Sequence, residues 1–142
     1  MECKDVGSLK QALDRVVSNT NGLAARSLDA ERDSVLELVV SRGPIGSKEL
    51  AVSLDLPPSL VLRNLRALAE SGLVVAVDHR WTAEPDIVAA TPTGREEVRR
   101  ITEARCHLLG VIVQDWGADD TAALTALLTR LAVDCSAFRR KL

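Results

Sequence analysis

Apolar residues recur at helical spacing along the first part of the chain. In residues 6–18 they fall three or four positions apart, which predicts an amphipathic helix that the polar segment 19–22 interrupts or frays. A second helix is predicted to start near Ser27 or Asp29, because capping and acidic side chains are favourable there, and to stop at Gly43-Pro44.

Two shorter helices follow, separated by a turn that contains two prolines. Ser47 is expected to be the N-cap of a helix over residues 48–54. The next helix is predicted to begin at Pro58, since proline fits the first position of a helix, and to run to about Ser71, where Gly72 ends it. Its predicted buried side consists of Val61, Leu65 and Leu68.

The pattern then changes from helical to β. The segment 73–77 is short and rich in β-branched residues, which predicts a strand, and residues 87–91 predict a second, weaker one. The nine residues between them are polar and contain Pro85, as expected of a hairpin loop.

Two long helices complete the chain. The first is predicted from Pro92 or Thr93 through Asp115, and its segment 107–113 is apolar on nearly every side, which requires cover from a larger surface such as a partner chain. The last helix is predicted to begin after Gly117. We expect it to bury Leu124, Leu127, Leu128, Leu131, Cys135 and Phe138.

This order of elements predicts a mostly α fold with a winged helix-turn-helix, in which a two-stranded wing follows the second of two short helices. A length of 142 residues suits a single domain. The composition agrees, because 46% of the residues are hydrophobic but only 2% are aromatic, which favours a helical core of aliphatic side chains. The same scarcity of aromatic residues argues against modules that stack nucleic-acid bases.

Charge and cysteine content narrow the class of protein further. The net charge of -2 gives no overall basic signal for nucleic acid. Three separated cysteines without a CxxC pair argue against a disulfide framework or a zinc site, and two histidines do not form a metal cluster. With no signal-peptide pattern and no apolar run of membrane-spanning length, we expect a cytoplasmic protein without a membrane partner.

Several stretches, in this order and spacing, resemble the MarR family of bacterial transcriptional regulators. The resemblance covers nearly the whole chain, and its wing and recognition helix depart from the family pattern. The stretches that carry it are Gly-Pro-Ile-Gly-Ser-Lys-Glu-Leu-Ala (43–51), Leu-Asp-Leu-Pro-Pro-Ser (54–59), Leu-Ala-Glu-Ser-Gly-Leu-Val (68–74), Thr-Pro-Thr-Gly-Arg (91–95), Asp-Trp-Gly-Ala-Asp-Asp (115–120) and Leu-Thr-Ala-Leu-Leu-Thr-Arg-Leu (124–131).

The resemblance implies a homodimer that binds double-stranded DNA and responds to a small-molecule effector. It implies one MarR-like domain over residues 1–142, with a DNA-binding lobe at about 28–92 and dimerisation helices at about 1–25 and 93–142. The expected function is that of a ligand-responsive repressor on a pseudo-palindromic operator, without a cofactor. The candidate DNA-binding residues are Ser47, Lys48, Ser59, Arg63, Asn64, Arg66 and Arg80.

Three departures from the family pattern bear on DNA binding. Leu60 and Leu62 stand where the family usually has Ser or Thr, and two exposed leucines offer contacts to thymine methyls rather than hydrogen bonds. The wing motif Asp-x-Arg is expected at residues 82–84, but Asp-His-Arg occurs at 78–80, so Arg80 reaches DNA only if the hairpin register shifts. Residues 42–81 contain five cations and four anions, a small excess for phosphate contacts.

The candidate effector residues implied by the resemblance are Arg15, Arg105, His107 and Trp116. An arginine there could pair with a carboxylate or phenolate. Three alternatives remain open: a redox sensor that uses Cys3 with Cys106 or Cys135, a co-regulator that forms heterodimers, and a scaffold without DNA binding that acts as a small-molecule-binding protein or an enzyme. For an enzyme, the candidate acid, base or anchor residues are His107, Arg105 and Asp115.

Overall fold

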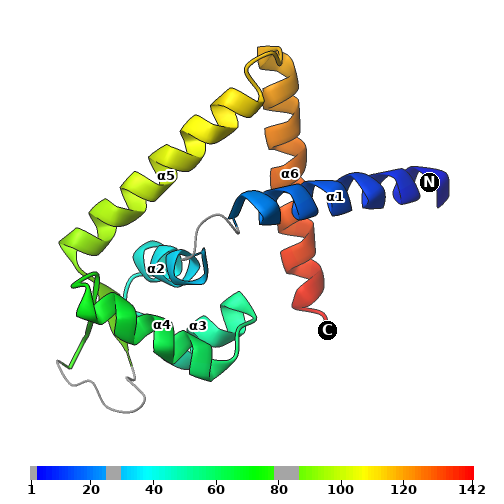
Figure 1. The fold of residues 1–142 in the computed structure, drawn as a ribbon. Coiled ribbons are helices and arrows are strands. Elements are labelled where there is room, and N and C mark those ends of the chain that lie inside the picture. Colours follow the sequence, from blue (N-terminus) through cyan, green and yellow to red (C-terminus); the bar gives the residue numbers. More distant parts are fainter. Residues whose placement is uncertain (1–2, 25–29, 79–86) are drawn as a thin grey trace. The chain divides into compact units, whose positions relative to one another are not determined.

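The computed structural model describes residues 3–24, 30–78 and 87–142 (Figure 1). Its elements follow one another as four helices, two strands and two helices, which confirms the predicted mostly α winged helix-turn-helix. The chain divides into two compact units, Met1–Ile101 and Thr102–Leu142, and the boundary falls within the helix α5.

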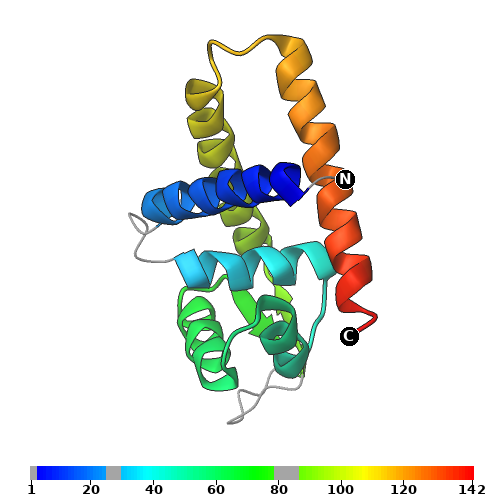
Figure 2. The ribbon, with the colours of Figure 1, turned by 90° about the vertical axis from the view of Figure 1, so that its right-hand side faces the viewer.

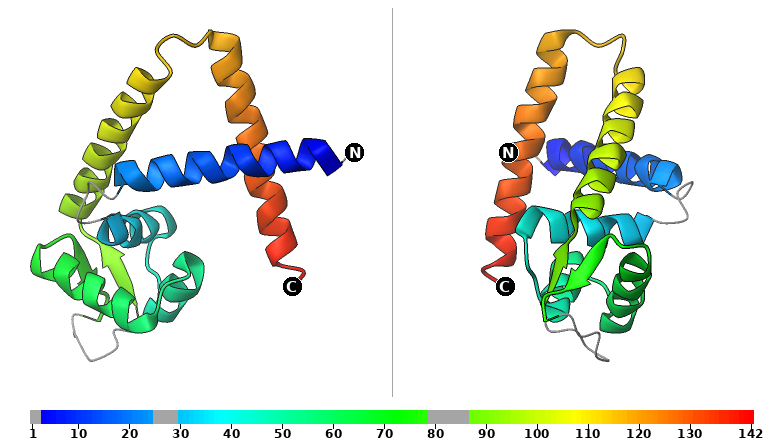
Figure 3. Two further views of the ribbon diagram at one scale, coloured as in Figure 1. Left: turned by 45° about the vertical axis from the view of Figure 1, so that its right-hand side comes forward. Right: turned by 90° about the vertical axis from the view of Figure 1, so that its left-hand side faces the viewer.

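The first unit contains a lobe built on α2 (Ala30–Arg42), α3 (Ser47–Leu54) and α4 (Pro58–Glu70). Figures 2 and 3 show these helices gathered with the two strands around one interior. The core is aliphatic, as the composition predicts. Its buried members include Val35, Leu36 and Val39 of α2, Leu50 of α3, Val61, Leu65 and Leu68 of α4, and Val74 and Val88 of the sheet.

The two strands, β1 (Val74–Ala76) and β2 (Val88–Ala90), form an antiparallel hairpin that is shorter than predicted. Val74 pairs with Ala90 and Ala76 with Val88. A further bridge joins β2 to the α2–α3 connection, where Ile45 and Val88 exchange backbone hydrogen bonds of 3.0 and 2.9 Å. The base of the wing is therefore joined through β2 to the connection between α2 and α3.

The first helix, α1, spans Cys3–Ala24 without a break, so the predicted interruption at residues 19–22 is wrong. The Thr20 hydroxyl donates to the carbonyl oxygen of Val16 at 2.8 Å, which ties this polar residue to the preceding turn of the same helix. A threonine bonded in this way continues a helix instead of capping or ending it.

The last two helices are α5 (Pro92–Ile112) and α6 (Ala118–Arg139), with Gly117 as the N-cap of α6. The prediction that α6 buries its apolar side chains is wrong for the single chain. Leu124, Leu127, Leu128 and Phe138 are exposed and Leu131 is half-buried. In α5, Leu108, Leu109, Val111 and Ile112 are exposed as well.

Among the described helices, α6 is long and apolar enough to cross a membrane by length and composition, with a mean hydropathy of 1.3. The expectation that no segment reaches that length is therefore wrong. Every 18-residue window of α6 nevertheless contains Arg130 and Asp134, and charged side chains are costly in hydrocarbon.

Candidate nucleic-acid interface

The buried residues of α4 show which side of the helix faces outward. Val61, Leu65 and Leu68 have no exposed surface and fix one side of the helix against the lobe. At 100° per residue, the opposite side is a straight stripe. The stripe consists of Ser59, Arg63, Arg66 and Glu70, all of them exposed.

The two arginines of this stripe have no competing partner in the described part of the chain. No ion pair or hydrogen bond joins either guanidinium group to another described residue. They line a shallow, open hollow together with Ser59, Leu62, Ala67 and Glu70. Arginines that keep all their donors free in a concave surface are suited to phosphate or guanine. The negative charge of Glu70 ends the basic part of this surface at the C-terminal end of the helix.

Three neighbouring residues of α4 lie off the stripe. Leu60 and Leu62 are half-buried, one on each flank, so the expectation that both are exposed is wrong. The Asn64 amide donates to the Leu60 carbonyl oxygen at 3.0 Å and is half-buried. Asn64 is thus turned toward its own helix, while Arg63 and Arg66 are directed outward.

The N-terminus of α3 is a second candidate surface. Gly46, not Ser47, is the N-cap, and Ser47 is already the first residue of the helix, which corrects the predicted cap. No side chain caps this end, so its first amide groups keep their capacity for an anion. Ser47 is half-buried beside the exposed Lys48, while Glu49 in the same turn opposes a phosphate.

The orientation of α3 is fixed by a contact from the end of α2. The Arg42 guanidinium donates to the Ser53 hydroxyl at 3.1 Å and to a Glu49 carboxylate oxygen at 3.4 Å. Arg42 is one of the five cations counted near the helix-turn-helix, and it is paired with one of the four anions. The cations left for a polyanion are Lys48, Arg63 and Arg66 within the described residues of this segment.

The wing contributes only its base to the described structure. Arg80, the predicted minor-groove residue, lies outside the described residues. Asp78, which precedes it, is exposed.

The candidate effector residues are distributed over both units. Arg15 is an exposed residue of α1, and Arg105 and His107 are exposed residues of α5. Trp116 is exposed between α5 and α6. Of the candidate redox residues, Cys106 and Cys135 are exposed free thiols rather than core residues, and the side chain of Cys3 lies outside the described part. Among the described residues, no group of His, Cys, Asp and Glu side chains could hold a metal ion.

A junction that sequence inspection treated only as a family-like stretch sets the start of α5. The Thr91 hydroxyl donates to the Gly72 carbonyl oxygen at 2.6 Å and accepts from the Gly94 amide at 3.1 Å, as an N-cap does. The Thr91 amide also donates to the Leu73 carbonyl oxygen at 3.0 Å. The signal in the sequence was Thr91-Pro92, a capping residue before a proline at the first helical position.

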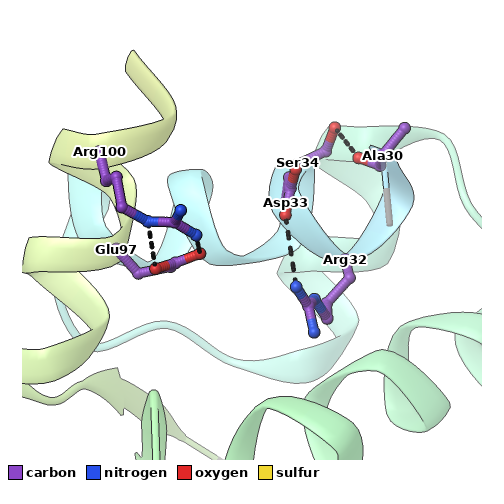
Figure 4. Close-up of polar contacts among 6 residues, drawn as sticks. All are labelled: Ala30, Arg32, Asp33, Ser34, Glu97 and Arg100. Carbon is purple, nitrogen blue, oxygen red and sulfur yellow. Dashed lines mark hydrogen bonds and ion pairs between the residues drawn. The ribbon is translucent and has the colours of Figure 1, made fainter. Parts of the chain in front are cut away.

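Charged side chains of α2 and of the first turns of α5 affect one another's pKa values. Figure 4 shows Arg32 and Asp33 on α2 and Glu97 paired with Arg100 on α5. The hydrogen bond from Arg100 lowers the pKa of Glu97, and the charge of Arg32 lowers it further. Asp33 is buried and raises the pKa of Arg100 slightly beyond the effect of Glu97. The charges at the start of α5 thus interact with the charges of α2 in the lobe.

Comparison of the sequence with family models and with curated proteins gives no match. Comparison of the fold with solved structures gives many. A MarR family protein from Bacillus stearothermophilus matches with a TM-score of 0.81 at 15% identity, over 96% of this chain and 99% of that one. A MarR family transcriptional regulator from Silicibacter pomeroyi matches with 0.66 at 17% identity, over 94% and 96%.

A third similar structure is the multiple antibiotic-resistance repressor MarR from Listeria monocytogenes, with a TM-score of 0.66 at 14% identity, over 96% of this chain and 97% of that one. These likenesses cover the helix-turn-helix, the wing and the long terminal helices together. The chain has the winged-helix fold of the MarR family structures, as the sequence resemblance predicted.

Proposed function

We propose that this protein is a DNA-binding transcriptional regulator that acts as a homodimer. The observation that carries the proposal is the outer face of α4, where Arg63 and Arg66 project from a helix-turn-helix without competing ion pairs in the described structure. The MarR-like winged-helix fold supports the same function.

In this proposal α4 enters the major groove of double-stranded DNA. Arg63 and Arg66 contact phosphate or guanine, and Ser59 contributes to the register at the N-terminal end of the helix. The uncapped amides of α3, with Ser47 and Lys48, lie against a phosphate of the same half-site. Arg80 of the wing approaches the minor groove, and Asn64 supports the helix instead of reading a base.

The apolar surfaces of the long helices support the homodimer. Residues of about 28–92 form the DNA-binding lobe, and residues of about 1–25 and 93–142 form the dimer interface. The exposed apolar residues of α1, α5 and α6 lie in these terminal segments. Two α4 helices related by a two-fold axis would then read a pseudo-palindromic operator, with half-sites about 34–36 Å apart.

The output we propose is ligand-responsive repression in the cytoplasm. A small anionic or aromatic molecule would bind near Arg15, Arg105, His107 and Trp116 and alter the separation of the two lobes. Because coupling between two sites is reciprocal, the same molecule must bind more weakly to the DNA-bound dimer than to the free dimer.

The test is binding of the purified protein to duplex DNA that flanks its own gene, measured by fluorescence anisotropy over a range of salt concentrations. Arg63→Ala and Arg66→Ala should each weaken binding and lower the slope of log K against log salt by about 1. Glu70→Gln removes the exposed anion of the same stripe and should not weaken binding. Unchanged affinity in both arginine variants would refute the assignment of α4.

A second candidate is a MarR-like scaffold that binds or converts a small molecule without binding DNA. Leu60 and Leu62 favour it, because they replace hydrogen-bonding residues on the helix that would read bases. Absence of binding to any duplex at low salt, together with a co-purified small molecule, would support this candidate.

A further inference from the structure

Leu62 occupies an unusual place for a leucine in this lobe. It lines the hollow on the outer side of α4, three positions after Ser59 and four positions before Arg66. Residues at these spacings are neighbours on a helix surface, so the leucine side chain lies between a hydroxyl and a guanidinium.

Packing of the lobe core does not account for Leu62. The half-buried apolar residues that pack against the core cluster are Leu38, Val40, Leu54, Leu56, Ala69, Ala90 and Val98. Leu62 is half-buried but is not one of these described core neighbours. Leu62 lines the hollow, so part of its apolar surface opens into it.

Leu60 provides a contrast on the same helix. It is also half-buried, but it lies on the opposite flank and does not line the hollow. Two positions along a helix correspond to a rotation of about 200°, so one surface cannot contact both leucines equally. Of the two leucines, only Leu62 lines the described part of the hollow.

If α4 lies in the major groove, as the proposed function requires, the hollow receives base edges. Leucine has no hydrogen-bonding group, and among the four bases only thymine presents an apolar group in that groove, its C5-methyl. Arg63 and Arg66 beside it recognise guanine or phosphate. We propose that Leu62 is a specificity-determining residue that reads a pyrimidine C5-methyl group, that of thymine in unmodified DNA, beside one of these arginine contacts.

This inference predicts what kind of half-site the protein prefers. A methyl contact selects one T·A pair in each half-site, and a bidentate arginine selects an adjacent guanine when it does not contact phosphate. The contact between Leu62 and the methyl group is apolar, so it adds discrimination between base pairs at one position without adding a phosphate contact.

The experiment begins with selection of duplexes from a random-sequence library by the wild-type protein. In the selected duplex, each thymine is then replaced singly by deoxyuridine, which lacks only the methyl group, and affinity is measured by anisotropy. At one thymine per half-site the replacement should weaken binding about three- to fivefold, the effect of one buried methyl-sized group. Replacements at the other thymines should have little effect.

Variants connect this effect to Leu62. Leu62→Ala should bind the thymine and uracil duplexes equally, whereas the matched Leu60→Ala should keep the wild-type ratio. Circular dichroism verifies that both variants are folded, and the uracil series on the wild-type protein needs no variant at all.

A methylated cytosine separates the methyl group from the rest of the base pair. When the critical T·A pair is replaced by 5-methylcytosine·G, binding should be stronger than with C·G by a similar factor. Equal affinity of wild type for thymine and uracil at every position, or a thymine preference that Leu62→Ala retains, would overturn the inference. Failure of the library to yield any bound duplex would instead refute the proposed function.

Discussion

At the scale of single residues, the charges of this protein are distributed so that few cations remain free. Arg42 pairs with Glu49, Arg99 with Glu96 and Arg100 with Glu97. These pairs explain how a chain of net charge -2 presents cations on one helix face: the acidic groups neutralise other arginines, while Arg63 and Arg66 keep their charge. A small number of free cations matters more for a polyanion than the total charge.

The ion pair of Glu97 with Arg100 should make the stability of the protein depend on pH. The hydrogen bond from Arg100 lowers the pKa of Glu97 below that of an unfolded chain. A lowered pKa contributes stability at pH values above the unfolded pKa, near 4.5, and that stability is lost as pH falls through the folded pKa. Glu97→Gln should therefore lower the thermal midpoint by about 1–2 °C at pH 7 and by less at pH 3.

Glu96→Gln is the matched control for this prediction. It removes the same kind of pair, with Arg99, but its carboxylate side chain is 64% exposed where that of Glu97 is 23% exposed. Greater screening by water should make its effect smaller. Thermal unfolding followed by circular dichroism at several pH values tests both variants, and a difference from wild type that does not shrink toward pH 3 would contradict the assignment.

At the scale of elements, the start of α5 is hydrogen-bonded to the lobe and packs so closely against it that one position has no room for a side chain. Thr91 bridges the Gly72 carbonyl and the Gly94 amide, and the α5 backbone approaches the backbone before β1. Position 94 is buried, and it has room only for glycine because a Cβ there would meet the Leu73 carbonyl oxygen. The close approach, and not a positive φ, is the reason for this glycine.

Gly94→Ala should consequently destabilise the protein. Its Cβ would lie 2.1 Å from the Leu73 carbonyl oxygen, a backbone atom that cannot rotate away, so strands or helix must shift. We expect a loss of about 1–3 kcal/mol or more, measured as the free energy of unfolding in urea.

Gly110→Ala, on the same helix, is the matched control. A Cβ at this exposed position meets no atom of the described chain within 4 Å, so the higher helix propensity of alanine should add about 0.5–1 kcal/mol. If Gly94→Ala unfolded at the wild-type urea concentration, the close contact would not hold in solution.

At the scale of the whole molecule, the apolar residues of the second unit support the proposed state of assembly. Residues 102–142 contain no fully buried residue, although α6 is rich in leucine and alanine. A helix that is apolar on several sides is stable in water only when it is covered. This is the physical basis of the proposed homodimer.

Leu127→Asp should disrupt that homodimer. The side chain is 64% exposed in the single chain, so aspartate costs little in a monomer, but it would bury an unpaired charge in a dimer interface. Light scattering after gel filtration should give about twice 15.3 kDa for the wild type and a mass near 15.3 kDa for the variant.

Val52→Asp is the corresponding control on α3. Val52 is 76% exposed and lies in the lobe rather than in the terminal helices, so this variant should keep the wild-type mass. A wild-type protein of 15.3 kDa at micromolar concentration, or a Leu127→Asp variant of unchanged mass, would contradict the dimer.

Much of the fold could be predicted because its signals are local. Pro58 at a first helical position, Gly72 after the last turn and the buried stripe of Val61, Leu65 and Leu68 were all readable from spacing, and all are confirmed. The errors arose where a local preference was overruled. Thr20 bonded back into α1 instead of breaking it, and Gly46 took the cap expected at Ser47.

The candidate site could be predicted only as a set of residue types. The sequence alone placed Ser59, Arg63, Asn64 and Arg66 on one helix, because helical spacing and a buried stripe define which residues are left over. It did not distinguish Asn64 from Arg63, nor Leu60 from Leu62, because spacing gives the side of the helix but not which side chain bonds back to the backbone or lines the hollow.

The sequence by itself therefore determined the order of the elements, the aliphatic core and the helix that carries the candidate DNA contacts, because periodicity, turns and caps act over a few residues. Only the tertiary structure decided that the backbone of Gly94 lies against that of Leu73, that Thr91 bridges Gly72 and Gly94, and that Ile45 pairs with Val88 of β2. These features depend on contacts between segments distant in the chain, and the pattern of residues along one segment does not contain them.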